Sequence, residues 1–259
     1  MRTRATLDEL LARPGRVLGS WSQIASPDLV ETLGRAGFAF TIIDCEHGAF
    51  GIETAEALIR AADAAAIAPL VRIPRGDAVM AGKALDAGAV GVLAPGVESA
   101  AEAQALCAAT RFAPGGSRGA CPIVRAAGHS LQPWDAFVAQ QDGNGLLVML
   151  ETAAAIEQCE AIVAVEGIKA VVAGPFDLSV SCGLEGDYRH PRVQAALERV
   201  LGAAMAHAVP LVMPVFAPDE PTLRELVGYW SARGVRHFAV GADKIFFAQA
   251  AARFRAWAS

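Results

Sequence analysis

The sequence lacks the features that mark secreted and membrane proteins. Its five cysteines form no CxxC pair and are odd in number, which is typical of a reducing compartment rather than a disulfide scaffold. No apolar run approaches the ~18 residues that a membrane-spanning helix needs. The first 15 residues contain no apolar segment of the kind found in signal peptides. We therefore expect a soluble cytoplasmic protein with no membrane partner.

An excess of positive charge is also lacking, and lysine is rare. The formal net charge is -5 and the arginines are scattered, so the chain has no electrostatic footprint for nucleic acid. There are only three lysines: Lys83 lies in a predicted helix, Lys169 precedes a predicted strand, and Lys244 opens the last helix. A Schiff-base aldolase needs a desolvated lysine inside its active-site mouth, so these positions disfavour imine chemistry.

Glycine-rich phosphate loops are missing as well. The first predicted βα turn, GSWSQIASP, does not match GxGxxG. The segments FAPDEP and GADK lack the glycines of a barrel phosphate site. We therefore expect neither a nucleotide nor a pyridoxal phosphate cofactor, and no phosphorylated substrate.

What the sequence does contain is an alternation of short apolar runs and alanine-rich helical segments. Continuously apolar runs are typical of parallel strands that are covered on both faces. They predict strands at residues 17–21, 39–44, 69–73, 90–94, 146–150, 170–174, 210–215 and 237–241. The alternation predicts a (β/α)8 TIM barrel, with residues 1–259 as a single domain. An open doubly wound sheet is the alternative.

Two segments stand apart from this alternation. Residues 111–145 form a long connection of a kind that is usually functional or interfacial, with a possible helix at 131–141. Residues 243–258 predict an amphipathic helix that carries several aromatic side chains. This helix either packs on its own barrel or docks on a second subunit, and the sequence leaves both alternatives open.

Polar side chains gather where the predicted strands end. In (β/α)8 barrels the active site lies at the C-terminal ends of the strands. The residues at or just after those ends are Trp21, Asp44, Glu46, His47, Arg72, Pro95, Gly96, Glu151, the run 174–177, Asp243 and Lys244. Charge is nearly absent inside the strands, so this convergence predicts an active site at one end of the barrel.

Glu151 and Asp177 follow neighbouring predicted strands, so their carboxylates are expected to lie close together. Two such carboxylates repel each other unless a cation lies between them. Oxygen ligands favour a hard divalent ion such as Mg²⁺ or Mn²⁺, and Co²⁺ could substitute. The competing interpretation is that Asp177 only caps the helix that follows it.

Arg72 and His47 are the other candidates for chemistry. An arginine that closes a buried strand needs an anion, which is either a substrate oxyanion or Asp44 on the neighbouring strand. His47 is a candidate general base because histidine is the side chain most often used for proton transfer near neutral pH. A lone histidine is more often structural, but this one lies beside several charged residues.

Four motifs in order resemble the HpcH/HpaI aldolases, the metal-dependent class II pyruvate aldolases. They are D-x-E-H in IIDCEHGAF, V-R-x-P in PLVRIPRGD, L-D-x-G-A in KALDAGA, and E-T…G-P-x-D-L-S in the segment after residue 150. The resemblance runs from about Leu18 to the final helix. It implies a TIM barrel that cleaves 4-hydroxy-2-oxo acids to pyruvate, or a close 2-oxo acid, and an aldehyde.

The resemblance also implies roles for individual residues. Glu151 and Asp177 would bind the divalent ion, Arg72 would stabilise the enolate, and His47 would accept a proton. Asp86 would raise the basicity of that histidine, within its own subunit or across an interface. Apart from the resemblance, the position of Asp44 beside Arg72 and His47 predicts that it orients Arg72 or the metal's water, and leaves open whether Asp44 or Asp86 tunes His47. The substrate-binding residues would be Trp21, Arg72, Met149, Gly174, Pro175, Phe176 and Asp177. The family is commonly a hexamer, a trimer of dimers that exchange the C-terminal helix.

Two positions depart from the family's pattern. Met149 stands where the family often has a glutamine, and Phe176 is larger than the usual alanine.

Two alternative functions keep the same site. One is a metal-dependent oxo-acid lyase or decarboxylase, and the other is a non-catalytic barrel that binds 2-oxo acids.

Overall fold

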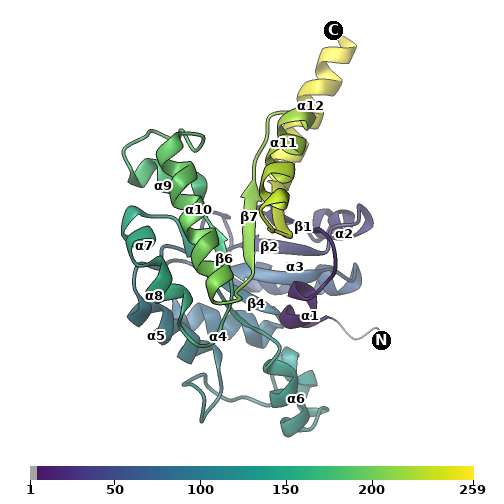
Figure 1. Cartoon of the computed structure of the whole chain (residues 1–259). Helices are drawn as coiled ribbons and strands as arrows, with labels where there is room; N and C mark the ends of the chain where they lie inside the picture. Colours follow the sequence, from purple (N-terminus) through teal and green to yellow (C-terminus); the bar gives the residue numbers. More distant parts are fainter. Residues whose placement is uncertain (1–4) are drawn as a thin grey trace.

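The computed structural model, in which residues 5–259 are described, is a closed barrel of parallel strands in the order β1 to β8 (Figure 1). The strands are β1 (Val17–Ser22), β2 (Phe40–Asp44), β3 (Ala68–Arg72), β4 (Gly91–Ala94), β5 (Gly145–Leu150), β6 (Ile168–Ala173), β7 (Leu211–Val215) and β8 (His237–Ala242). Each overlaps its predicted run, with ends displaced by no more than two residues. The predicted (β/α)8 barrel is confirmed.

Helices fill the connections between the strands. They are α1 (Leu7–Leu11), α2 (Pro27–Arg35), α3 (Ile52–Ala64), α4 (Ala78–Ala87), α5 (Ala100–Thr110), α6 (Trp134–Gln141), α7 (Ala153–Glu157), α8 (Cys159–Val163), α9 (Pro175–Ser181), α10 (Pro191–Ala206), α11 (Glu220–Ala232) and α12 (Asp243–Ala258), with a 3-10 segment η1 (Arg125–Ser130). The side chain of Ser26 caps α2 by accepting the N–H of Leu29. Gly88 ends α4 at a φ of 105°, a left-handed conformation that glycine adopts at little cost.

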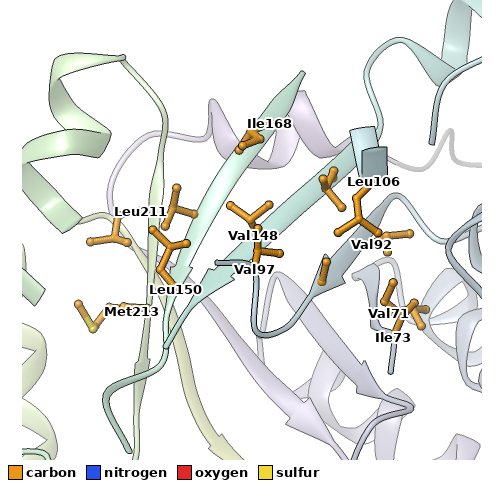
Figure 2. Close-up of a cluster of buried hydrophobic side chains, with 14 of the residues drawn as sticks. Val71, Ile73, Val92, Val97, Leu106, Val148, Leu150, Ile168, Leu211 and Met213 are labelled. Carbon is orange, nitrogen blue, oxygen red and sulfur yellow. The ribbon is translucent and has the colours of Figure 1, made fainter. Parts of the chain in front are cut away.

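Apolar side chains on the two faces of the sheet form two cores. One core lies inside the barrel and includes Phe40, Leu70 and Met149. The other lies between the sheet and the surrounding helices, where Val148 and Leu150 of β5 pack beside Met213 of β7 (Figure 2). Alternate residues of a strand point to opposite faces, so strands that face two apolar layers are apolar throughout.

The long connection after α5 lies at the end of the barrel opposite the strand C-termini. It leaves the end of α5 at Thr110 and enters the first residue of β5 at Gly145, and it contains η1 and α6. The predicted helix at 131–141 is therefore present as α6, which begins at Trp134. Within one chain, this connection is remote from the residues that follow the strands.

The C-terminal helix α12 rises away from the barrel instead of lying against it (Figure 1). Its residues from Ala251 to the end of the chain are all exposed. Three large side chains, Phe247, Phe254 and Trp257, are each more than two-thirds exposed, at 69%, 67% and 68%. No helix among residues 5–259 is both long and apolar enough to cross a membrane.

Candidate active site

A cavity of about 320 Å³ opens at the C-terminal ends of the strands. The seven residues that were predicted to bind substrate line it together with the predicted proton acceptor, His47, from five different strands or the loops after them. They are Trp21, His47, Arg72, Met149, Gly174, Pro175, Phe176 and Asp177. The structure thus brings these residues together in one cavity, and their roles stay predictions.

Asp44 and Arg72 form a buried ion pair in this mouth. The two residues are register partners at the ends of β2 and β3. Arg72 donates through Nε to Oδ1 of Asp44 at 2.8 Å and through Nη2 to Oδ2 at 2.5 Å. Burial opposes charge on Asp44, but the hydrogen bonds and the charge of Arg72 hold the pKa of its carboxyl below the usual value. The predicted pairing of Asp44 with Arg72 is therefore present.

The same carboxylate also fixes the turn that follows β2. Oδ1 of Asp44 accepts the backbone N–H groups of Glu46 and His47, each at 3.1 Å. Oδ2 accepts an N–H from the side chain of Gln23 at 2.7 Å. A short acidic side chain that accepts backbone N–H groups two and three residues ahead is a common way to hold a tight turn. Asp44 thus places both the guanidinium and the residues after it.

Glu46 and His47 lie at the outer side of this turn. Oε2 of Glu46 is 3.2 Å from Nη1 of Arg72 and 3.9 Å from Nε2 of His47. Burial raises the pKa of Glu46, although the charges of Arg72 and His47 act in the opposite direction. The His47 side chain is 62% exposed, so it can reach a ligand in the cavity. Glu46, one of the residues expected at this strand end, thus lies within ion-pair distance of this ring.

Glu151 and Asp177 lie at the ends of the paired strands β5 and β6. Glu151 is 8% exposed, and its Oε1 accepts the backbone N–H of Gly96 at 2.7 Å. Burial, followed by the negative charge of Asp177, raises the pKa of Glu151 to about 7. Asp177 lies in the first turn of α9, whose N-terminus has no side-chain cap. Capping therefore does not account for Asp177.

The donor set of these two carboxylates fits a hard divalent ion. A cation between them would remove the repulsion that raises the pKa of Glu151. Gly174 leaves room beside them, because a Cβ there would lie 2.4 Å from Cβ and 2.8 Å from Oε2 of Glu151. Residues 5–259 contain no group of three or more His, Cys, Asp or Glu arranged around a common point. An ion held here would keep several coordination positions open for a chelating ligand.

Two further residues support the mouth. The ring of Trp21 stacks on Arg72, with the guanidinium carbon 4.6 Å from the ring centroid. Asp243, at the start of α12, accepts the backbone N–H groups of Gln23 and Ile24 at 2.9 and 2.8 Å. These bonds tie the loop after β1 to the end of β8, which keeps Trp21 and Gln23 in place.

Asp86 is not brought to this mouth within one chain. It lies near the C-terminal end of α4, a helix that leaves the end of β3 and returns to the beginning of β4. Its carboxylate accepts a hydrogen bond from Nη2 of Arg118 at 2.7 Å, in the long connection. The β4 boundary agrees with the predicted one, so Asp86 sits at the opposite end of its own barrel from His47.

Sequence reasoning missed one wall of the cavity. It is formed by residues around β7, α10 and α11, namely Tyr188, Gln194, Leu197, Met213, Pro214, Val215, Phe216, Leu226 and Trp230, with Ala242 and Ile245 of β8 and α12. Most are apolar, and in the sequence they are indistinguishable from core residues. Only the spacing of the helices shows that they border the cavity.

The raised pKa of Glu151 predicts that the free energy of unfolding depends on pH when a chelator keeps the protein free of metal ions. Its folded pKa of about 7 lies above the value of 4.5 for an unperturbed glutamate. The stabilisation of the folded state by protonated Glu151 is therefore complete below pH 4.5 and is lost as the pH rises through about 7. Urea denaturation should show the free energy of unfolding falling over this range, by an amount on the order of 3 kcal/mol at most.

The variant Glu151→Gln, which keeps the shape but not the charge, should lose this fall. Glu157→Gln serves as the matched control, because Glu157 is an exposed residue at the end of α7. This variant should retain the fall in stability. An equally steep fall in Glu151→Gln would show that other groups carry the effect.

Comparison with known proteins adds to this geometry. A family model described as HpcH/HpaI aldolase/citrate lyase matches residues 18–249. The chain is 32% identical over 235 residues to the 2-dehydro-3,6-dideoxy-6-sulfogluconate aldolase of Pseudomonas putida, covering 90% of this chain and 89% of that protein. It is 33% identical over 226 residues to the 5-keto-4-deoxy-D-glucarate aldolase of Salmonella paratyphi A, covering 87% and 86%.

A solved structure agrees with these relatives. An HpcH/HpaI aldolase/citrate lyase family protein of Burkholderia cenocepacia J2315 is similar with a TM-score of 0.88 at 29% identity, over 98% of both chains. The family model covers most of the barrel, from β1 into α12. The chain therefore belongs to the HpcH/HpaI aldolase/citrate lyase family.

Proposed function

We propose that this carbon–carbon lyase is a class II pyruvate aldolase whose divalent ion, Mg²⁺, Mn²⁺ or Co²⁺, is held by Glu151 and Asp177. Its reaction is the reversible cleavage of a 4-hydroxy-2-oxo acid to pyruvate, or a close 2-oxo acid, and an aldehyde. The observation that carries the proposal is the fixed guanidinium of Arg72, which lines the same cavity as Asp177 and His47. The named aldolases among its relatives support the same reaction class.

The ion, when bound, supplies a Lewis acid that polarises the keto group of the 2-oxo acid. Arg72 adds a fixed positive charge beside the oxygen on which negative charge develops as the carbon–carbon bond breaks. Such charges stabilise a transition state most when they are held in place before the reaction. Asp44 and the ring of Trp21 hold this one. In this proposal, the backbone around Phe176 and Asp177 binds the pyruvate carboxylate.

His47 accepts the proton of the 4-hydroxyl group in this proposal. Its ring is exposed to the cavity, and Glu46 lies 3.9 Å from it. Loss of that proton converts the hydroxyl into the aldehyde carbonyl, while the electron pair of the broken bond passes to the enolate of pyruvate. Asp86 would assist His47 only from a second copy of the chain, because it lies at the far end of its own barrel.

Replacing Arg72 by lysine should test the central role of the guanidinium. Lysine carries the same charge but cannot bind Asp44 through two parallel bonds. We expect Arg72→Lys to lower kcat for retro-aldol cleavage about 10²- to 10³-fold, measured by coupled detection of pyruvate. Arg75→Lys is the matched control, because Arg75 lies three residues away and its side chain is 55% exposed.

Three results would contradict this mechanism. One is near-full cleavage activity in Arg72→Lys. The second is cleavage activity that survives exhaustive chelation. The third is trapping of pyruvate on Lys244 by borohydride, which would replace the metal mechanism by an imine.

The oligomeric state is part of the same proposal. We place α12 against a second copy of the chain, in a hexamer built as a trimer of dimers. The support is the exposure of Phe247, Phe254 and Trp257 on a helix that rises away from its own barrel (Figure 1). Large exposed apolar groups that gather on one element mark a contact surface.

The double variant Phe254→Asp and Trp257→Asp should break this contact. We expect it to lower the mass measured by light scattering to that of a smaller assembly, because the buried apolar area is replaced by charge. Val79→Asp, at an isolated apolar residue of α4 that is 71% exposed, should leave the mass unchanged. A wild-type protein that is already monomeric would contradict the proposal.

A further inference from the structure

The active-site cavity has two ends of different chemistry. One end carries the charged groups Arg72, His47 and Asp177. The other end passes over the C-terminal end of β7, between α10 and α11, which lie on either side of that strand (Figure 1). Its lining is apolar: Leu197, Met213, Val215, Leu226, Trp230 and Ile245.

The polar side chains at the apolar end already bind backbone carbonyls. Gln194 donates through Nε2 to the carbonyl oxygen of Tyr188 at 2.7 Å. The hydroxyl of Tyr188 donates to the carbonyl oxygen of Phe216 at 3.5 Å. These two bonds occupy one N–H of Gln194 and the hydroxyl hydrogen of Tyr188, which leaves fewer donors for a ligand. A hydroxylated ligand that entered this end would therefore give up water for few new hydrogen bonds.

The walls of the apolar end are tied together. Glu198 of α10 accepts hydrogen bonds from the hydroxyl of Tyr229 and from Nε of Arg233, both at 2.7 Å. Glu198 follows Leu197, and Tyr229 precedes Trp230, so the bonds lie next to two residues that line the cavity. The apolar end is thus a preformed space between two linked helices, and it is continuous with the catalytic mouth.

We propose that the apolar end receives the carbon chain of the aldehyde acceptor, so that the preferred acceptors are unbranched aliphatic aldehydes and not polyhydroxylated ones. This inference rests on the proposed aldolase function, and it assigns a substrate class to the part of the site that the chemistry does not use. Each methylene that enters an apolar site improves binding about fourfold. A hydroxyl buried there without a partner weakens binding by roughly tenfold.

A series of aldehydes tests the proposal with pyruvate as donor and Mg²⁺ present. We expect kcat/KM to rise about fourfold for each methylene from propanal to pentanal. Glyceraldehyde should be used at least about tenfold less well than butanal. A preference for glyceraldehyde over butanal would overturn the proposal.

A pair of variants on α11 locates the effect. Leu226→Asn places an amide in the apolar end, whereas Leu223→Asn changes a leucine that is likewise partly buried on the same helix but does not line the cavity. We expect Leu226→Asn to lower the pentanal to glyceraldehyde ratio of kcat/KM about tenfold. Leu223→Asn should leave that ratio unchanged. Equal effects in both variants would contradict the assignment.

Two further measurements separate this proposal from its alternatives. Exchange of the pyruvate methyl hydrogens with D₂O, followed by NMR without any aldehyde, reports the enolate chemistry alone. If exchange proceeds but aliphatic acceptors are not preferred, the acceptor proposal fails and the aldolase proposal stands; if exchange is absent, both fail.

The second measurement is the mass of Leu226→Asn in light scattering. A changed mass, with an unchanged pentanal to glyceraldehyde ratio of kcat/KM, would show that a second copy of the chain fills the apolar end.

Discussion

Two opposite charges, Asp44 and Arg72, lie side by side inside an apolar barrel, and the geometry of the mouth depends on this pair. Burying an ion costs several kcal/mol, and the loss is offset only when its hydrogen-bonding capacity is well satisfied. Here both oxygens of Asp44 are engaged, by the guanidinium, by Gln23 and by two backbone N–H groups. The register of β2 and β3 sets the two side chains level with each other.

The consequence is that one carboxylate places most of the charged groups in the mouth. The turn held by Asp44 presents Glu46 and His47 on its outer side, within 3.9 Å of each other. Glu46 in turn approaches Arg72 at 3.2 Å. A histidine on an exposed turn would ordinarily move freely, but this one follows a turn that an ion pair anchors. Positioning by a rigid second layer of contacts is what allows a side chain on a loop to act precisely enough for catalysis.

The carboxylates of the mouth have opposite environments, which divides their roles. Asp44 is kept ionised by its donors, and its pKa lies below the usual value. Glu151 is buried beside Asp177 with a single backbone donor, and its pKa is raised to about 7. A carboxylate with too few donors and a like charge nearby is suited to receive a cation. This contrast separates Asp44, which binds Arg72, from Glu151, which we propose as a ligand of the divalent ion.

The sequence predicted the barrel well because its strands are short, continuously apolar and separated by helical segments, which few other folds require. It also predicted the mouth residues, since the chain order of strand ends is enough to bring Asp44, Arg72, Glu151 and Asp177 together in a barrel. The pairing of Asp86 with Arg118 could not be predicted, because it joins residues 32 apart through an irregular connection. The apolar wall of the cavity could not be predicted either. In the sequence, Leu226 and Trp230 resemble core residues, and only the spacing of α10 and α11 shows that they line a cavity.

The most direct test of the central role of the Asp44–Arg72 pair is a double-mutant cycle read by the exchange of pyruvate methyl hydrogens with D₂O. If Asp44 acts through Arg72, the variant that combines Asp44→Asn with Arg72→Lys should exchange within about twofold of the slower single variant. Circular dichroism should first show that each variant retains the fold. Losses that multiply in the double variant would contradict the account, because they would mean that Asp44 and Arg72 act independently.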